Sequence, residues 1–251
     1  MQDQASSIPF AWAWVAFGLG DARLGDTTYG QYRYADLPPL PPLDGTLSWL
    51  GQPGWLKLPD MSPDQQAAHE RFTAEAQAHV RNLATQAERW GVRLPATFTH
   101  LMAAPELYTR IPEYAGCWFN LWDAQLDPCP GVEDAFVVRF LNDQQDCVLW
   151  YLYFSRRGDE AVLAVWDPYP DAPSNYLERL VRPDEDGPVT EQERRAVLSN
   201  TYACAPSFEA FVYRWWLETT IYMKLHGYDS ESLTEEEHRY LAHYEQGRFA
   251  E

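Results

Sequence analysis

The chain has 251 residues, of which 15% are aromatic and 11 are tryptophan, and its net charge is −18. This aromatic content excludes a disordered chain, because burying the apolar side chains offsets the conformational entropy that the chain loses on folding. The negative charge repels phosphate backbones and anionic membranes, and the basic pairs at 156–157 and 194–195 are too isolated to form a basic stripe. We therefore expect no nucleic-acid or membrane partner, and we consider a basic protein partner because acidic surfaces attract such proteins.

The N-terminal part predicts an aromatic strand followed by a proline-rich run. Residues 1–7 lack the positive charge of a signal peptide. The apolar run 8–20 is shorter than the ~20 residues needed to span a bilayer, and its alternation of aromatic and small residues favours a strand. Residues 37–43 predict polyproline II, either a spacer whose leucines pack on the domain or a docking motif. We expect a cytoplasmic protein in which residues 1–63 are an extension packed on the core.

The first long helix is predicted over residues 64–90. Ser62, Pro63 and Gln65 form a capping-box signature at its start, and Gly91 provides the stop. Its apolar residues recur every three or four positions: Phe72, Ala76, Val80, Leu83, Ala87 and Trp90. A second, short helix after Leu94-Pro95 is predicted to turn Phe98, Leu101 and Met102 inward.

The middle of the chain predicts strands. Segments rich in Val, Leu, Phe, Trp and Tyr lie at 116–122, 135–142, 147–154 and 161–166. Short polar loops separate the last three, which predicts an antiparallel meander. Residues 168–189 are rich in Pro and Asp and predict a surface loop.

Three further helices are predicted near the C-terminus. Thr190 with Glu193 opens a short one, Ser207 caps a long one over 208–226, and Thr234 with Glu237 caps a last one reaching about residue 246. The last is polar and is expected at the periphery, within a C-terminal segment 227–251 that follows a core domain at 64–226. These patterns predict an α+β fold with one mixed, mainly antiparallel sheet and helices packed on one side.

The sequence contains no recognisable catalytic motif. Neither a phosphate-binding loop nor a GxSxG nucleophile elbow occurs. The four cysteines, Cys117, Cys129, Cys147 and Cys204, form no Cys-x-x-Cys pair, and the six histidines lack metal-ligand spacing. Buried free thiols in a reducing compartment are the favoured interpretation. We therefore expect no metal, no cofactor, no catalytic residue and no enzymatic activity.

Three segments carry a resemblance to a known family. Leu94-Pro95 opening a short helix, the string 140–152 (FLNDQQDCVLWYL) and the run 207–218 (SFEAFVYRWWLE) occur in the order found in the SUKH superfamily. The chain resembles that superfamily over residues 64–226. One departure is Ala103-Ala104-Pro105-Glu106, where the family often has an Asn-Gly-Gly-type turn. Residues 1–60 have no assigned counterpart.

The resemblance implies a single α+β domain and, for bacterial members, an immunity protein that neutralises a toxin, often a nuclease, by direct binding. On this interpretation the chain is a monomer or weak dimer that binds a basic protein. The predicted interface residues are Trp122, Asp143, Asp146 and Asp167 at strand ends, for which a core Trp and turn-forming Asp residues are the alternative. A regulatory or scaffold protein of the same fold, and a hydrolase without a recognisable motif, remain open.

Overall fold

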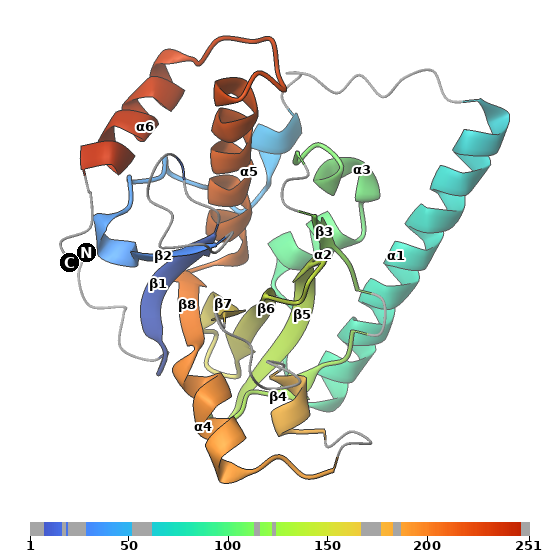
Figure 1. The fold of residues 1–251 in the computed structure, drawn as a ribbon. Coiled ribbons are helices and arrows are strands. Elements are labelled where there is room, and N and C mark those ends of the chain that lie inside the picture. The colour runs from blue at the N-terminus through green and yellow to red at the C-terminus, as the bar shows by residue number, and fades with distance from the viewer. Residues whose placement is uncertain are drawn as a thin grey trace.

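The computed structural model describes residues 8–16, 19, 29–51, 62–112, 116–121, 124–166, 177–182 and 187–246. These residues form one mixed, mainly antiparallel sheet with helices around it (Figure 1). The strands are β1 (Ala11–Ala16), β2 (Gly30–Arg33), β3 (Cys117–Phe119), β4 (Asp127–Pro128), β5 (Ala135–Asp143), β6 (Val148–Ser155), β7 (Glu160–Trp166) and β8 (Thr201–Ala205). Their order is β2-β1-β8-β7-β6-β5-β3, with β4 also paired to β5. The predicted α+β class is confirmed.

The antiparallel meander β5-β6-β7 forms the middle of the sheet, as the alternating strands and polar loops predicted. Tyr151 of β6 lies opposite Arg139 of β5 and Leu163 of β7. The β5-β6 hairpin turns through Asp146, whose φ of 55° is a left-handed conformation that Asp tolerates better than most residues. Strand β8 was not predicted, because its five residues follow directly on a helix and carry little apolar pattern of their own.

The N-terminal extension contributes to the same sheet. Strand β1 pairs with β8 in parallel, Ala11 opposite Tyr202, and β2 adds to β1 in antiparallel fashion. The predicted boundary at residue 63 therefore cuts through the sheet, since two of its strands come from the segment before it.

The helices are α1 (Pro63–Arg89), α2 (Ala96–Met102), α3 (Pro105–Tyr108), α4 (Glu191–Ser199), α5 (Phe208–Leu225) and α6 (Glu235–Gln246). Three short 3-10 helices lie at η1 (Tyr34–Asp36), η2 (Ser48–Gly51) and η3 (Glu178–Leu180). The predicted capping boxes of α1 and α4 are present. None of these helices combines the length and apolarity that crossing a membrane requires.

Helix α1 buries less of its apolar stripe than its periodicity predicted. Val80, Leu83 and Ala87 in its second half are buried, whereas Phe72 and Trp90 are 48% and 45% exposed. Figure 1 shows why Phe72 is exposed: only the later turns of α1 lie near the sheet, and its first turns lie away from it. The periodicity of a helix shows which face is apolar, but its orientation against the sheet decides how far along its length that face is covered.

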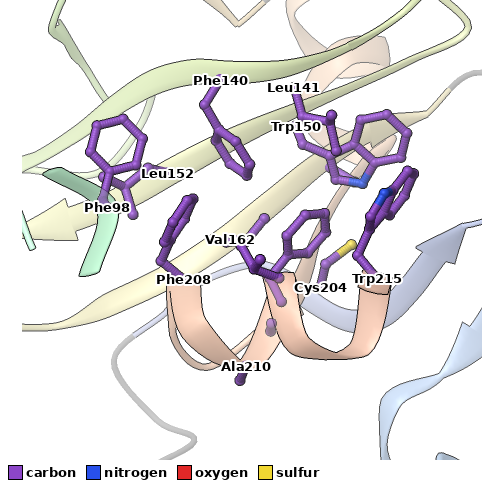
Figure 2. Packing of buried hydrophobic residues seen from close by; sticks show 14 of the residues in the cluster. Phe98, Phe140, Leu141, Trp150, Leu152, Val162, Cys204, Phe208, Ala210 and Trp215 are labelled. Carbon is purple, nitrogen blue, oxygen red and sulfur yellow. The ribbon is translucent and has the colours of Figure 1, made fainter. Parts of the chain in front are cut away.

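The main core lies between α5, α2, α1 and one face of the sheet. Figure 2 shows Phe208 and Trp215 of α5 pointing at Phe140 and Trp150 of the sheet, with Phe98 of α2 beside them. The ring centroids of Phe140 and Phe208 lie 5.1 Å apart at 72°, and those of Trp150 and Trp215 lie 5.0 Å apart at 75°. Such edge-to-face contacts add about 0.5–1.5 kcal/mol each beyond the buried area.

The second face of the sheet has a smaller core of its own. Val137, Leu149, Leu163 and Ala203 point toward this face and pack with Val197 of α4. Leu177 and Leu180, at η3, join the same cluster. The long helices thus lie on the predicted single side, while the short α4 and η3 cover part of the other. Of the predicted loop 168–189, residues 168–176 and 183–186 lie outside the described residues.

The proline-rich run packs against α5, in agreement with the spacer interpretation. Leu37 and Pro38 are buried, and the Pro38 carbonyl accepts a hydrogen bond from Arg214 Nη2 at 2.8 Å. Further along, the Glu209 carboxylate accepts hydrogen bonds from the Gly45 amide at 2.7 Å and the Leu47 amide at 3.2 Å. These bonds hold Leu47 at a φ of 57°, so the run is part of the folded domain.

A buried hydrogen-bond network joins α5 to β1 and α6. Glu218 of α5 accepts hydrogen bonds from Trp14 Nε1 at 2.9 Å and from the Tyr240 hydroxyl at 2.6 Å. The Tyr240 oxygen in turn accepts from Arg214 Nη1 at 2.6 Å. Burial raises the pKa of Glu218 to about 6, although Arg214 and the two hydrogen bonds act to lower it.

The variant Glu218→Gln tests this burial. Because the folded-state pKa of Glu218 lies above its ordinary value of 4.5, its contribution to stability is present below pH 4.5 and lost as the pH rises through 6. A shift of this size is equivalent to about 2 kcal/mol. The unfolding free energy is measured by urea titration at pH 4 and at pH 7. Its fall between these two pH values should be smaller in Glu218→Gln than in the wild type by that amount. The exposed control Glu75→Gln should show the same pH dependence of the unfolding free energy as the wild type. If Glu218→Gln also shows that pH dependence unchanged, the raised pKa of Glu218 is contradicted.

Candidate functional site

A pocket of about 140 Å³ opens on the second face of the sheet, beside its β3 and β4 edge. Its floor comes from β5 and β6, and its walls come from β3, the segment that leads into β4, and η3. The lining residues are Trp118, Asn120, Ala124, Gln125, Asp127, Val137, Arg139, Asn142, Asp146, Tyr151, Glu178 and Arg182. Most of them are polar, in contrast to the apolar core on the other face.

A β-bulge in β5 sets which side chains reach this pocket. The pairing of β5 with β6 shifts between Arg139 and Leu141, so Phe140 is the extra residue. Phe140 and Leu141 both enter the main core, and Asn142 returns to the pocket face beside Arg139. If the same residues alternated strictly without a bulge, Leu141 would face the pocket and Asn142 would face the apolar core. The bulge therefore places two polar side chains of one strand in the same pocket.

Two arginines and two carboxylates of the pocket form ion pairs with one another. Arg139 Nε lies 3.4 Å from Glu178 Oε1, and the Tyr151 hydroxyl donates to Glu178 Oε2 at 2.6 Å. Arg182 Nη2 pairs with Asp127 Oδ2 on the opposite wall. Burial raises the pKa of Asp127 to about 6, partly offset by Arg182. These charges are thus satisfied within the protein, and no cysteine or serine stands among the lining residues.

A second surface feature lies at the turn between α5 and α6. The side chains of Tyr228 and Leu225 are 70% and 46% exposed, and Tyr228 is the most exposed of the large apolar side chains in the described part of the chain. Between residues 225 and 238 the sequence has five carboxylates and no Lys or Arg: Asp229, Glu231, Glu235, Glu236 and Glu237. We call residues 225–236 the acidic turn. It combines two exposed apolar side chains with three exposed carboxylates, Glu231, Glu235 and Glu236.

The acidic turn is held in place by bonds at both of its ends. Gly227, with a φ of 71°, ends α5, and the Tyr228 amide donates to the Met223 carbonyl at 2.9 Å. At the other end Thr234 caps α6, since its hydroxyl accepts from the Glu237 amide at 3.2 Å. Glu237 also forms a buried ion pair with Lys224, with both oxygens 2.9 Å from Nζ. The turn is therefore presented on a fixed backbone.

Of the four predicted interface residues, the structure describes two. Trp122 and Asp167 lie outside the described residues. The Asp143 side chain is inside the protein, where it accepts hydrogen bonds from the Tyr29 hydroxyl at 2.8 Å and from two amides of its own hairpin turn at 3.1 Å. It matches the turn-forming alternative. Asp146 is exposed and lines the pocket.

Apart from Asp146, which lines the pocket, the residues discussed for the two features were not predicted from the sequence as site residues. Arg139, Tyr151 and Glu178 come from separate elements, and only the folded sheet brings them together. The acidic turn could have been noticed in the sequence. Its acidic residues are not interrupted by Lys or Arg, and they follow Gly227-Tyr228, a pair typical of a turn on the surface. Its α6 is not purely peripheral, since Tyr240 and Glu237 are buried against α5.

Comparisons of the chain with protein-family profiles, with curated proteins and with solved structures find no match in any of the three. The resemblance to the SUKH superfamily therefore stays a prediction from the sequence. Within the described ranges, no group of three or more His, Cys, Asp or Glu side chains is arranged to hold a metal ion. The two surface features are what the structure itself offers for inferring a function.

Lys224→Ala should destabilise the protein by about 3–5 kcal/mol, because it leaves the Glu237 carboxylate buried without its cation. The matched control is Arg195→Ala, whose ion pair with Glu191 on α4 is exposed on both sides, and removal of such a pair costs about 0–1 kcal/mol. Urea unfolding at pH 7 measures both. Equal, small effects of the two variants would show that α6 does not depend on the Lys224–Glu237 pair.

Proposed function

We propose that the protein is a non-catalytic protein-binding module, and that the acidic turn is where a basic protein docks. The observation that carries this proposal is the exposure of Tyr228 and Leu225 next to a run of carboxylates that follows them in the sequence. An exposed apolar side chain alone is ordinary on protein surfaces. An aromatic side chain surrounded by one sign of charge is what a charged partner with an apolar contact point would recognise.

The two parts of the turn would contribute differently to binding. Tyr228 is the anchor, because a buried aromatic side chain at the centre of an interface can contribute 2 kcal/mol or more, ~30-fold in affinity. The carboxylates of Glu231, Glu235 and Glu236 are exposed and would form the rim. Rim charges mainly raise the association rate and make it sensitive to salt, since the Debye length is only ~8 Å at physiological ionic strength. The net charge of −18 acts in the same direction.

The backbone bonds of the turn support this role. Gly227, the Tyr228 amide and the Thr234 cap hold the turn in one conformation. A preformed surface loses less conformational entropy on association than a flexible one. The pocket beside β3 supports a catalytic role less well, because two of its three carboxylates, Glu178 and Asp127, are paired with arginines.

We further propose that the partner is a toxin and that the protein belongs to the immunity-type SUKH proteins. The support for this finer statement is the sequence resemblance over residues 64–226, together with the α+β fold that it implies. A stoichiometric inhibitor needs an interface and no catalytic machinery. A strongly acidic protein is suited to a nuclease, which carries positive charge in order to bind nucleic acid.

The test is binding of one purified partner to three forms of the full chain. Tagged wild-type protein captures candidates at low salt, and each is then purified and titrated by calorimetry. We expect a 1:1 complex whose affinity falls at least tenfold in Tyr228→Ala and in the triple variant Glu231→Gln, Glu235→Gln, Glu236→Gln. The salt dependence of binding should become weaker in the triple variant and stay unchanged in Tyr228→Ala. The toxin assignment predicts that the partner is toxic when expressed alone and harmless together with the wild-type chain.

The matched control neutralises three exposed carboxylates elsewhere, with Glu70→Gln, Glu75→Gln and Glu88→Gln on α1. It changes the net charge equally and should leave most of the affinity intact. If the control weakens binding as much as the triple variant, the net charge and not the acidic turn is responsible. Partners that bind Tyr228→Ala as tightly as the wild type would place the interface elsewhere.

A further inference from the structure

We propose that the pocket beside β3 binds a neutral, polyhydroxylated ring, as found in a monosaccharide or at the end of a glycan. This inference goes beyond the protein partner proposed above and uses different elements of the fold. It rests on the size of the pocket, the pairing of its charges, its polar groups and the position of one tryptophan.

The size of the pocket is suitable for a small ring. Its volume is about 140 Å³. A single water molecule needs roughly 10–15 Å³ of such space, so the pocket has room for on the order of ten water-sized groups. A hexose ring with its hydroxyl groups is of that order, whereas a nucleotide or a longer peptide would extend well beyond the pocket.

The paired charges favour a neutral ligand over an ion. A cation that enters the pocket would approach the guanidinium groups of Arg139 and Arg182. An anion would approach the carboxylates of Glu178 and Asp127, which are bonded to those same arginines. Desolvating a charge next to a like charge is costly at a partly buried site. A neutral ligand meets neither penalty and leaves both ion pairs in place.

The remaining polar groups suit hydroxyl groups, which both donate and accept hydrogen bonds. Arg182 Nε is buried and has no hydrogen-bond partner among the described residues, so it is a donor in need of an acceptor. Asn142 and Gln125 add amide groups that supply one donor and one acceptor side by side. The paired carboxylate oxygens keep further lone pairs. Amide and carboxylate groups are planar, and each can form hydrogen bonds with two adjacent hydroxyls of a ring.

Trp118 provides the apolar contact that a sugar ring needs. It lies directly opposite Asn142 in the β3-β5 pairing, so its indole stands on the same face as the Asn142 amide. Its side chain is 40% exposed although it lines the pocket. A sugar ring has one face of C–H groups that can lie on an aromatic ring, while its hydroxyls point sideways to polar groups. The pocket thus pairs an apolar wall with polar ones, as this class of ligand requires.

The experiment is titration of the full chain with neutral hexoses and N-acetylhexosamines, followed by tryptophan indole signals in NMR spectra. We expect millimolar binding of at least one neutral sugar, weakened at least tenfold in Trp118→Ala and in Asn142→Ala. The matched control is Trp90→Ala, since Trp90, directly after α1, is 45% exposed and lies outside the pocket. This variant should bind as the wild type does.

Charged probes complete the test. Glucosamine as a cation, gluconate as an anion and a zwitterionic amino acid should each bind more weakly than the best neutral sugar. The proposal is overturned if no neutral sugar perturbs the indole signals, if a charged probe binds more tightly, or if Trp118→Ala and Trp90→Ala lose affinity equally. None of these outcomes depends on whether a protein docks at the acidic turn.

Discussion

Three charged side chains of α5, Glu209, Arg214 and Glu218, are buried although they belong to the most apolar helix of the protein. Each one bonds to a segment distant in the sequence: Glu209 to the loop at 45–49, Arg214 to Pro38 and Tyr240, and Glu218 to Trp14 and Tyr240. Buried polar groups need such partners, because an unpaired one costs about 1–3 kcal/mol or more when charged. Segments near both ends of the described chain, at Trp14 and at Tyr240, are therefore hydrogen-bonded to α5.

The two faces of the sheet have different roles, because the side chains of β5 point alternately to one face and to the other. One face is covered by α5 and closed by aromatic contacts, so it provides stability. The other face is only partly covered by α4 and η3, and its open part holds the pocket. The bulge at Phe140 separates these roles along a single strand. Bulges are common at sheet edges and beside functional sites, where they redirect side chains.

Charge is distributed so that it disturbs folding little and remains available for binding. Inside the protein, Lys224 with Glu237 and Arg182 with Asp127 form pairs. Other carboxylates of the described residues, such as Glu231 and Glu235, are exposed, where salt screens their repulsion. At the acidic turn exposed carboxylates follow an exposed Tyr228, and at the pocket Glu178 and Asp127 are paired with arginines. The two surface features consequently suit different ligands, a basic protein and a neutral ring.

Local features of the sequence determined the helices and the central strands. Capping residues such as Ser62, Thr190 and Ser207 act within three residues, and the β5-β6-β7 meander depends on neighbours in the chain. Pairing between distant segments was decided only by the tertiary structure. It placed β1 beside β8, turned Asp143 inward to Tyr29, left Phe72 exposed, and brought Arg139, Asp127 and Glu178 to one pocket. No local pattern encodes these contacts, because each depends on how α5 and the bulged sheet pack together in space.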